Sequence, residues 1–251
     1  NKINVDHTKE PMFFGKGLNL QRYDKTRYKS NLEFFKQQLS FFWRPEEVSL
    51  DNESADWVKM SDAQKHIFVK NLSYQILLDS VQGRGIHNII DYASNPEIEA
   101  FGKAWEFQET IHSYSYSWII MNLFSKPSEV FDEILNDEEI LKRASSVTKY
   151  YDELIEKTAD KNATEEKLRN EPSEGFQDIV KECDETVIQM YRDAAQEEIE
   201  WANYLFKDGE MIGLNSEILK KYMMFLTNQR MKIIGLEPIF EKTKNPIPWI
   251  K

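Results

Sequence analysis

The stretch Trp105–Tyr116 places a glutamate, a histidine and a tyrosine at intervals of three and four residues. On an α-helix, which turns about 100° per residue, Glu109, His112 and Tyr116 project from one face within roughly 60° of arc. Trp105 joins this face one turn earlier. A Glu-x-x-His pair on an inward helix face is how four-helix bundles bring ligands to a shared pair of metal ions. The stretch therefore predicts a metal site inside a helical bundle.

The helix expected before this stretch supplies a second inward carboxylate. Asp79 falls on the same stripe as the apolar residues Phe68, Leu72 and Ile76. Burying two carboxylates and an imidazole without partners would cost roughly several kcal/mol each, against a total stability of about 5–15 kcal/mol. A divalent metal ion would offset that cost. Two carboxylates with one imidazole favour iron or manganese over a structural zinc.

Each of these residues also has an ordinary structural role open to it. Alone, His112 would be a hydrogen-bonded core histidine, and Tyr116 a core tyrosine with a satisfied hydroxyl. Trp43 stands where a helix is expected to stop, and would pack there. Tyr114 lies about 200° around the helix from His112, so we expect it at a surface or interface. No supporting context for metal binding surrounds His7, His66 or His87. The late helix carries Glu197, Glu198 and Glu200, which are most simply its solvated side, with roughly a one in ten chance that one of them is a ligand.

Helical periodicity extends through most of the chain, and strand patterns are almost absent. Ser61 and Gln64 form a capping box that predicts a helix start, Gly83 and Gly85 predict its end, and Asn95-Pro96 predicts the next start. This pattern favours an all-α bundle. The expected helices cover about residues 32–43, 61–85, 95–124, 127–135, 137–158, 174–206 and 215–234.

Composition excludes several classes of function. The 251 residues, 41% of them hydrophobic, suffice for one sizeable domain, which we place at residues 31–251 behind a polar arm at 1–30. A net charge of -11 argues against direct binding of nucleic acid. The single cysteine, Cys183, fits the reducing cytoplasm, and no apolar run is long enough to cross a membrane. We therefore expect a soluble cytoplasmic protein.

Seven segments of the chain are specific in combination. They are EPMFFG (10–15), QLSFFWRPEE (38–47), LLDSVQGR (77–84), ETIHS (109–113), YYDELI (150–155), WANYLFKDG (201–209) and NPIPW (245–249). In these segments the chain resembles the radical-generating small subunit of class I ribonucleotide reductase, over about residues 10–158 and 170–251. The resemblance implies a ferritin-like helical bundle, a homodimer and a large-subunit partner.

The resemblance also implies a role for each candidate residue. Asp79, Glu109 and His112 are then ligands of the first ion of a dinuclear iron or manganese/iron centre. Tyr116 stores a radical formed when this centre reacts with O2, and Trp43 begins the path that passes the radical to the large subunit. The implied activity is that of an oxidoreductase, active only with the large subunit, that reduces ribonucleotides to deoxyribonucleotides for DNA replication.

The chain departs from this family in the second half of the metal site. The family's second ion takes a Glu from one further helix and a second Glu-x-x-His from another, yet no histidine follows His112. We therefore expect that part of the bundle core is missing, at a segment near residues 160–170. Either the natural protein contains these helices and the present sequence omits them, or the protein lacks them. We favour the first, since a natural loss would leave three inward ligands facing a void.

Two other functions remain open. The chain is alternatively a non-catalytic, degenerate relative that binds or regulates the large subunit without forming a radical. A third hypothesis is a ferritin-like iron-binding oxidase with an unrelated partner. Radical formation and the intact mass of the protein distinguish these hypotheses.

Overall fold

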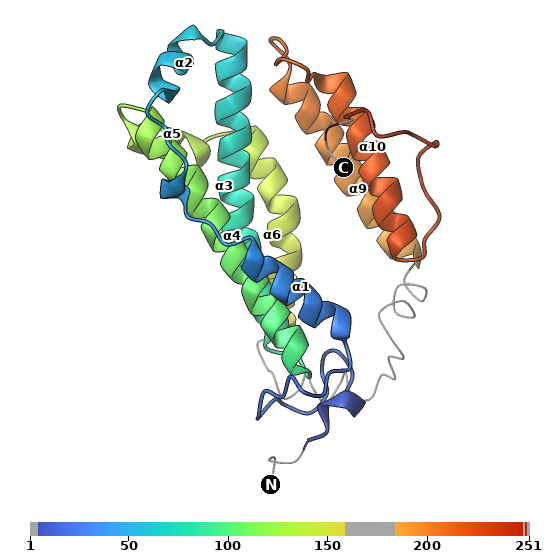
Figure 1. Cartoon of the computed structure of the whole chain (residues 1–251). Helices are drawn as coiled ribbons and strands as arrows, with labels where there is room; N and C mark the ends of the chain where they lie inside the picture. The colour runs from blue at the N-terminus through green and yellow to red at the C-terminus, as the bar shows by residue number, and fades with distance from the viewer. Residues whose placement is uncertain (1–4, 159–183, 248, 250–251) are drawn as a thin grey trace. The chain divides into compact units, whose positions relative to one another are not determined.

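The computed structural model describes residues 5–158, 184–247 and 249. Within these residues the chain forms eight α-helices, two short 3-10 helices and two isolated β-bridges, which confirms the all-α prediction (Figure 1). The expected missing segment near 160–170, and the expected helix start near 174, lie outside the described residues. The elements are η1 His7–Lys9, α1 Lys29–Ser40, η2 Pro45–Glu47, α2 Glu53–Lys59, α3 Asp62–Ile90, α4 Pro96–Leu123, α5 Pro127–Ile134, α6 Glu138–Thr158, α9 Asp184–Leu205 and α10 Ser216–Ile233.

Helix α3 begins as predicted and ends later than predicted. At its start the Ser61 N–H donates to Gln64 Oε1 at 2.9 Å, and the Gln64 N–H donates to Ser61 Oγ at 3.2 Å, which confirms the capping box. The helix then passes through Gly83 and Gly85 and continues to Ile90. The predicted end is wrong because Gly85 serves close packing: a Cβ there would lie 2.0 Å from the ring of Tyr151 on α6.

The corner between α3 and α4 is held by the N-terminal arm. The Phe14 N–H donates to Tyr92 O at 2.8 Å, and the Ser94 N–H donates to Met12 O at 3.0 Å. Asn95 occupies the predicted N-cap position of α4, but its side chain donates to Pro11 O at 2.6 Å and does not cap the helix. The N-terminal arm therefore fixes, through hydrogen bonds, the link between α3 and α4, the two helices that carry the candidate metal ligands.

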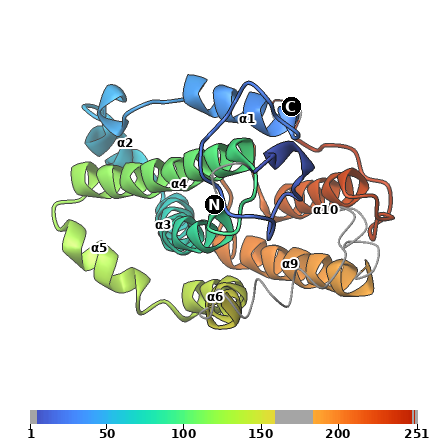
Figure 2. The ribbon, with the colours of Figure 1, turned by 90° about the horizontal axis from the view of Figure 1, so that it is seen from below.

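Contacts divide the chain into two compact units, Asn1–Ala55 with Leu72–Pro172 and Asp56–Asn71 with Ser173–Lys251, so that the boundary falls inside α3. In the first unit, α4 lies between α1 and α3, and α3 lies between α4 and α6 (Figures 1 and 2). In the second unit, α9 packs along α10, and Met231 and Leu236 are buried in their core.

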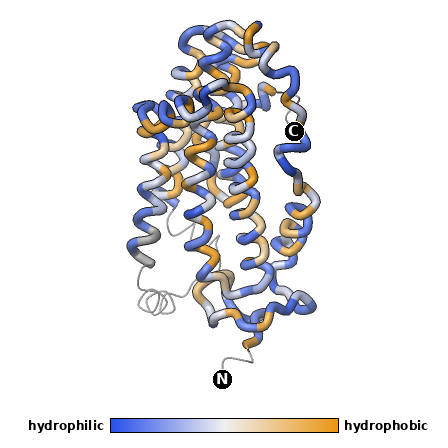
Figure 3. The backbone as a smooth tube through the Cα atoms, turned by 90° about the vertical axis from the view of Figure 1, so that its left-hand side faces the viewer, coloured by the Kyte–Doolittle hydropathy of each residue, from blue (hydrophilic) through white to orange (hydrophobic). Residues whose placement is uncertain are grey.

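The hydropathy of the helices is mixed along their length. Hydrophilic and hydrophobic stretches alternate along the tube (Figure 3). Of the helices in the described ranges, none has both the length and the apolar character that spanning a membrane requires.

Candidate metal centre

The three predicted ligands converge in the structure. Asp79 comes from α3, and Glu109 and His112 come from α4. One ligand atom from each lies within 4.8 Å of the other two. His112 Nδ1 is 3.2 Å from Glu109 Oε2 and 3.8 Å from Asp79 Oδ2. Two neighbouring helices thus build a cluster of two carboxylates and one imidazole.

Small residues allow α3 and α4 to approach each other closely at this cluster. A Cβ at Gly83 of α3 would lie 3.5 Å from the Cβ of Glu109, and a Cβ at Gly102 of α4 would lie 2.6 Å from Ile90 Cγ1. A side chain at Gly102 would collide with Ile90 and push the helices apart, whereas a Cβ at Gly83 would make only an ordinary van der Waals contact. The close approach of α3 and α4 therefore depends on Gly102.

Glu109 is the most firmly held of the three candidate ligands. Its side chain is buried, and Oε1 accepts hydrogen bonds from Trp105 Nε1 at 2.8 Å and from Gln82 Nε2 at 2.9 Å. Oε2 is left to face His112. Donors of this kind orient metal-ligating carboxylates. Trp105 lies on this face as predicted, whereas Gln82 was not predicted to contact Glu109; its position three residues after Asp79 on the same helix was the available signal.

Asp79 is the candidate ligand whose pKa is clearly shifted. Burial, and then the negative charge of Glu109, raise its pKa to about 6, while His112 acts in the opposite direction. The side chain of His112 is 38% exposed, whereas those of Asp79 and Glu109 are 18% and 10% exposed. The cluster therefore combines two largely buried carboxylates with an imidazole on its open side.

Tyr116 lies one turn of α4 beyond His112 and is half-buried. Its pKa is raised, first by burial and then by the charges of Asp79 and Glu109. Within the described residues its hydroxyl forms no hydrogen bond. Tyr116 is therefore a phenol that stays protonated at neutral pH, beside the charges of the cluster.

Trp43 lies in the short link between α1 and η2 and is half-buried. The structure joins this link to α4 on either side of Trp43: Phe42 stacks on Phe107 with ring centroids 6.1 Å apart, and Tyr114 donates from its hydroxyl to Glu46 at 2.7 Å. Tyr114 is exposed, as predicted. Within the described part of the chain the indole of Trp43 forms no hydrogen bond, so the structure does not connect it directly to the cluster.

The other histidines lie elsewhere. His7 contacts Ser94 O through Nδ1 at 3.1 Å, His66 contacts Tyr204 O through Nε2 at 3.4 Å, and His87 lies 3.6 Å from Glu106. None of them belongs to the cluster. Glu197, Glu198 and Glu200 belong to α9 in the second unit.

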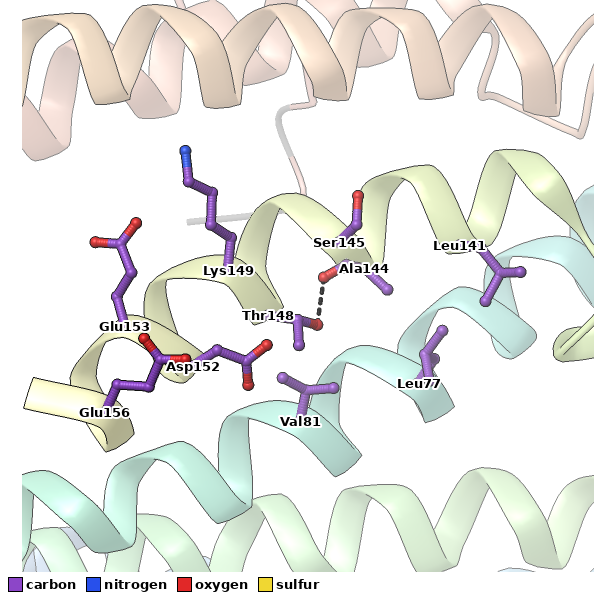
Figure 4. A pocket seen from close by; sticks show the side chains of 10 residues that line it. All are labelled: Leu77, Val81, Leu141, Ala144, Ser145, Thr148, Lys149, Asp152, Glu153 and Glu156. Carbon is purple, nitrogen blue, oxygen red and sulfur yellow. Dashed lines mark hydrogen bonds between the residues drawn. The ribbon is translucent and has the colours of Figure 1, made fainter. Parts of the chain in front are cut away.

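A groove of about 550 Å³ lies on the other side of α3, against α6 (Figure 4). Leu77 and Val81 form its α3 wall, and none of the three candidate ligands lines it. The reason is the helical period, since residues two positions from Asp79 point about 200° away from it. The α6 wall carries Leu141, Ala144, Ser145, Thr148, Lys149, Asp152, Glu153 and Glu156.

Tyr151 is a second residue near the cluster that sequence reasoning did not single out. Its ring fills the space that Gly85 leaves open, and burial followed by the charge of Glu109 raises its pKa. The tyrosine belongs to the YYDELI segment, but only the packing of α6 on α3 shows that it lies close enough for the charge of Glu109 to affect its pKa.

The donor set fits one divalent ion of the iron or manganese type. Two carboxylates and one imidazole make three protein ligands, and a second ion needs a further set. In the described ranges this cluster is the one group of three or more His, Cys, Asp or Glu side chains close enough to share a metal ion. Because no histidine follows His112, the chain fits half of a dinuclear set.

Comparison with known proteins shows what the chain is similar to. The model of the family "Ribonucleotide reductase, small chain" matches residues 21–177 and 166–246. The chain is 36% identical to ribonucleoside-diphosphate reductase 1 subunit beta of Salmonella typhimurium, over 98% of this chain and 86% of the relative. It is 33% identical to the corresponding subunit of Enterobacteria phage T4, over 98% of this chain and 87% of the relative.

Solved structures agree with these matches. The R2 subunit of ribonucleotide reductase from Clostridium botulinum superposes with a TM-score of 0.78 at 26% identity, covering 96% of this chain and 93% of that chain. The match to the Salmonella subunit spans 325 residues, more than the 251 of this chain, so the relative contains residues within the match that this chain lacks. The two pieces of the family match overlap at residues 166–177.

Proposed function

The chain belongs to the ribonucleotide reductase small-chain family, and from this premise we propose that it is the radical-generating subunit of a class I enzyme. The family makes it the small subunit of an oxidoreductase, ribonucleoside-diphosphate reductase, whose partner is a large subunit. The observation that carries the radical-generating role is the convergence of Asp79, Glu109 and His112, with Tyr116 one turn further along α4.

In this proposal the three ligands hold the first ion of a dinuclear iron or manganese/iron centre. The bound centre supplies, from O2, the oxidising power that removes one electron from a phenol. Glu109 is kept in position by Trp105 and Gln82. Tyr116 is the residue that is oxidised, and burial together with the charges of Asp79 and Glu109, which raise its pKa, keeps its phenol protonated beforehand. The described residues fit only one ion, so the second set of ligands must come from elsewhere.

Replacing Tyr116 by Phe tests the radical role. We expect protein treated with ferrous iron and O2 to show a tyrosyl signal by electron paramagnetic resonance, and Tyr116→Phe to abolish it. Tyr114→Phe is the matched control, because Tyr114 lies on the same helix but is exposed and points away from the cluster. A signal that survives Tyr116→Phe would remove Tyr116 from the role.

The runner-up function is a non-catalytic relative that binds or regulates the large subunit. The observation in its favour is that the sequence has no second Glu-x-x-His. The intact mass of the protein isolated from its source distinguishes the two. We expect a mass clearly above 29.7 kDa, because the catalytic form needs further helices. A mass near 29.7 kDa, together with no tyrosyl signal, would favour the non-catalytic relative.

A further inference from the structure

Glu97 is a buried carboxylate for which the proposed function has so far given no role. It lies in the first turn of α4, and the residue is 1% exposed. Its Oε1 accepts hydrogen bonds from the backbone N–H groups of Arg27 and Tyr28, both at 2.9 Å. Tyr28 is the N-cap residue of α1, and its own side chain does not cap the helix. Glu97 therefore does from another helix what the glutamate of a capping box does from within one.

The electrostatic setting favours a negative charge on Glu97. The carboxylate belongs to the first turn of α4 and binds N–H groups at the start of α1, and the N-terminus is the positive end of a helix dipole. These two dipoles and the two hydrogen bonds offset the cost of burying a carboxylate. An apolar residue in its place would leave two partly buried N–H groups without their acceptor. The contact therefore holds the starts of α1 and α4 together.

Helix α1 is attached to α4 beyond this contact as well. In the middle of α1, the rings of Phe34 and Phe101 have their centroids 6.2 Å apart. Near its end, Gln108 Nε2 donates a hydrogen bond to Gln38 O at 3.2 Å. The contacts advance in the same direction along both helices, so α1 lies parallel to α4. Glu97 fixes one end of this pair of helices, and Gln108 fixes α1 near the other end.

Trp43 follows the end of α1 and is held between two further contacts to α4. On either side of Trp43, Phe42 and Glu46 contact positions 107 and 114 of α4. Glu109 and His112 lie between these two positions. The indole is therefore held at the level of the candidate metal ligands by a segment that begins at the contact with Glu97.

We propose that Glu97 is a positioning residue for the radical path: it anchors the start of α1 on α4, and α1 transmits this constraint to Trp43. The inference rests on the proposed function, because Trp43 is the residue through which that function passes the radical to the large subunit. Glu97 lies twelve residues before Glu109, which is about 18 Å along the axis of α4. Glu97 therefore acts on the placement of Trp43 and not on the metal ligands.

Spin labels measure how α1 is placed on α4. The labels are attached at Leu39→Cys near the end of α1 and at Met121→Cys on α4, two exposed positions, in a chain whose own cysteine is replaced by Cys183→Ser. We expect pulsed electron paramagnetic resonance to give one narrow distribution of distances between the labels, and Glu97→Leu to broaden or shift it. An unchanged distribution would overturn the inference. The measurement needs no metal, so it is independent of the ligand assignment.

Three further variants make this measurement specific. Glu97→Gln keeps an acceptor oxygen and should keep the narrow distribution. Glu97→Asp has a shorter side chain and should broaden the distribution less than Glu97→Leu; it replaces that variant in both experiments if Glu97→Leu does not fold. Glu99→Leu is the matched control in the same turn, because the Glu99 carboxylate binds Gln21 and Lys103 instead of the start of α1. Equal broadening in Glu99→Leu would overturn the assignment to Glu97.

Turnover with the large subunit tests the consequence for the radical path. We expect Glu97→Leu to keep the tyrosyl signal and to lower turnover about tenfold or more, because a small displacement of a reacting group has a large effect on rate. Glu97→Gln should restore turnover. Full turnover in Glu97→Leu would overturn the inference and leave the proposed function intact. Loss of the tyrosyl signal in Glu97→Leu would place its effect at the metal centre and overturn the inference too. If the wild-type protein forms no tyrosyl signal, the proposed function fails and this inference fails with it.

Discussion

Glu109 connects more of the candidate centre than any other residue. One of its oxygens accepts hydrogen bonds from Trp105 and Gln82, and the other faces His112. Burial raises the pKa values of Asp79, Tyr116 and Tyr151, and the charge of Glu109 adds to each of these increases. Glu109 is therefore both held in place by its neighbours and able to influence their protonation.

At the residue scale, Asp79 makes the metal-free chain sensitive to pH. Its folded pKa of about 6 lies above the ordinary value of 3.8, so the folded state binds the proton more tightly than the unfolded state. The stability that this proton provides is present below about pH 4 and is lost as the pH rises through 6. The ionised side chain therefore destabilises the metal-free chain at neutral pH.

We expect Asp79→Asn to raise the free energy of unfolding of the metal-free chain at pH 7.5 by about 1–2 kcal/mol, after allowance for partial exposure. The effect should be much smaller at pH 4. Urea denaturation with chelator at both pH values measures it. With Mn(II) the order should reverse, because the variant loses a ligand. A variant that is equally destabilised at both pH values without metal would contradict this electrostatic reading.

At the element scale, the spacing of α3 and α6 depends on Gly85. A Cβ there would overlap the ring of Tyr151, whereas a Cβ at Gly83 would make an ordinary contact of 3.5 Å with Glu109. We expect Gly85→Ala to destabilise the fold by about 1–3 kcal/mol, because the ring must move or the helices must separate.

Gly83→Ala is the matched control on the same helix. It should be neutral or stabilising by up to about 1 kcal/mol, because alanine is the better helix former. Thermal unfolding followed by circular dichroism compares the two variants. Equal losses of stability would show that the approach of α6 at Gly85 is not the cause.

At the scale of the whole molecule, the proposed function requires a radical formed in the helical core to reach the large subunit. Trp43 is the proposed first step, and it lies in a link fastened to α4 by Phe42 and Glu46. We expect Trp43→Phe to leave the tyrosyl signal unchanged and to abolish turnover with the large subunit. Activity and paramagnetic resonance measured on the same sample test this. Trp57→Phe, on α2, is the control and should keep both; loss of the radical in Trp43→Phe would contradict the assignment.

Local pattern was enough to predict the helices and the faces of their ligands. The 3.6-residue period aligns Glu109 with His112 whatever surrounds the helix, and the Ser61–Gln64 capping box forms within a single turn. The family resemblance added roles for Tyr116 and Trp43, which remain proposals.

Only the tertiary structure decided how these helices meet. Gln82 on α3 donates a hydrogen bond to Glu109 on α4, and Tyr151 on α6 packs at Gly85 on α3. These contacts join residues far apart in the sequence. The exposure of His112 also depends on which helices pack around it. Helical periodicity determines the direction of a side chain around its own axis. The distance between two helix axes is set by the side chains packed between them. Gly83 and Gly85 were expected to end α3, but they lie where neighbouring helices pack closely, and α3 continues to Ile90.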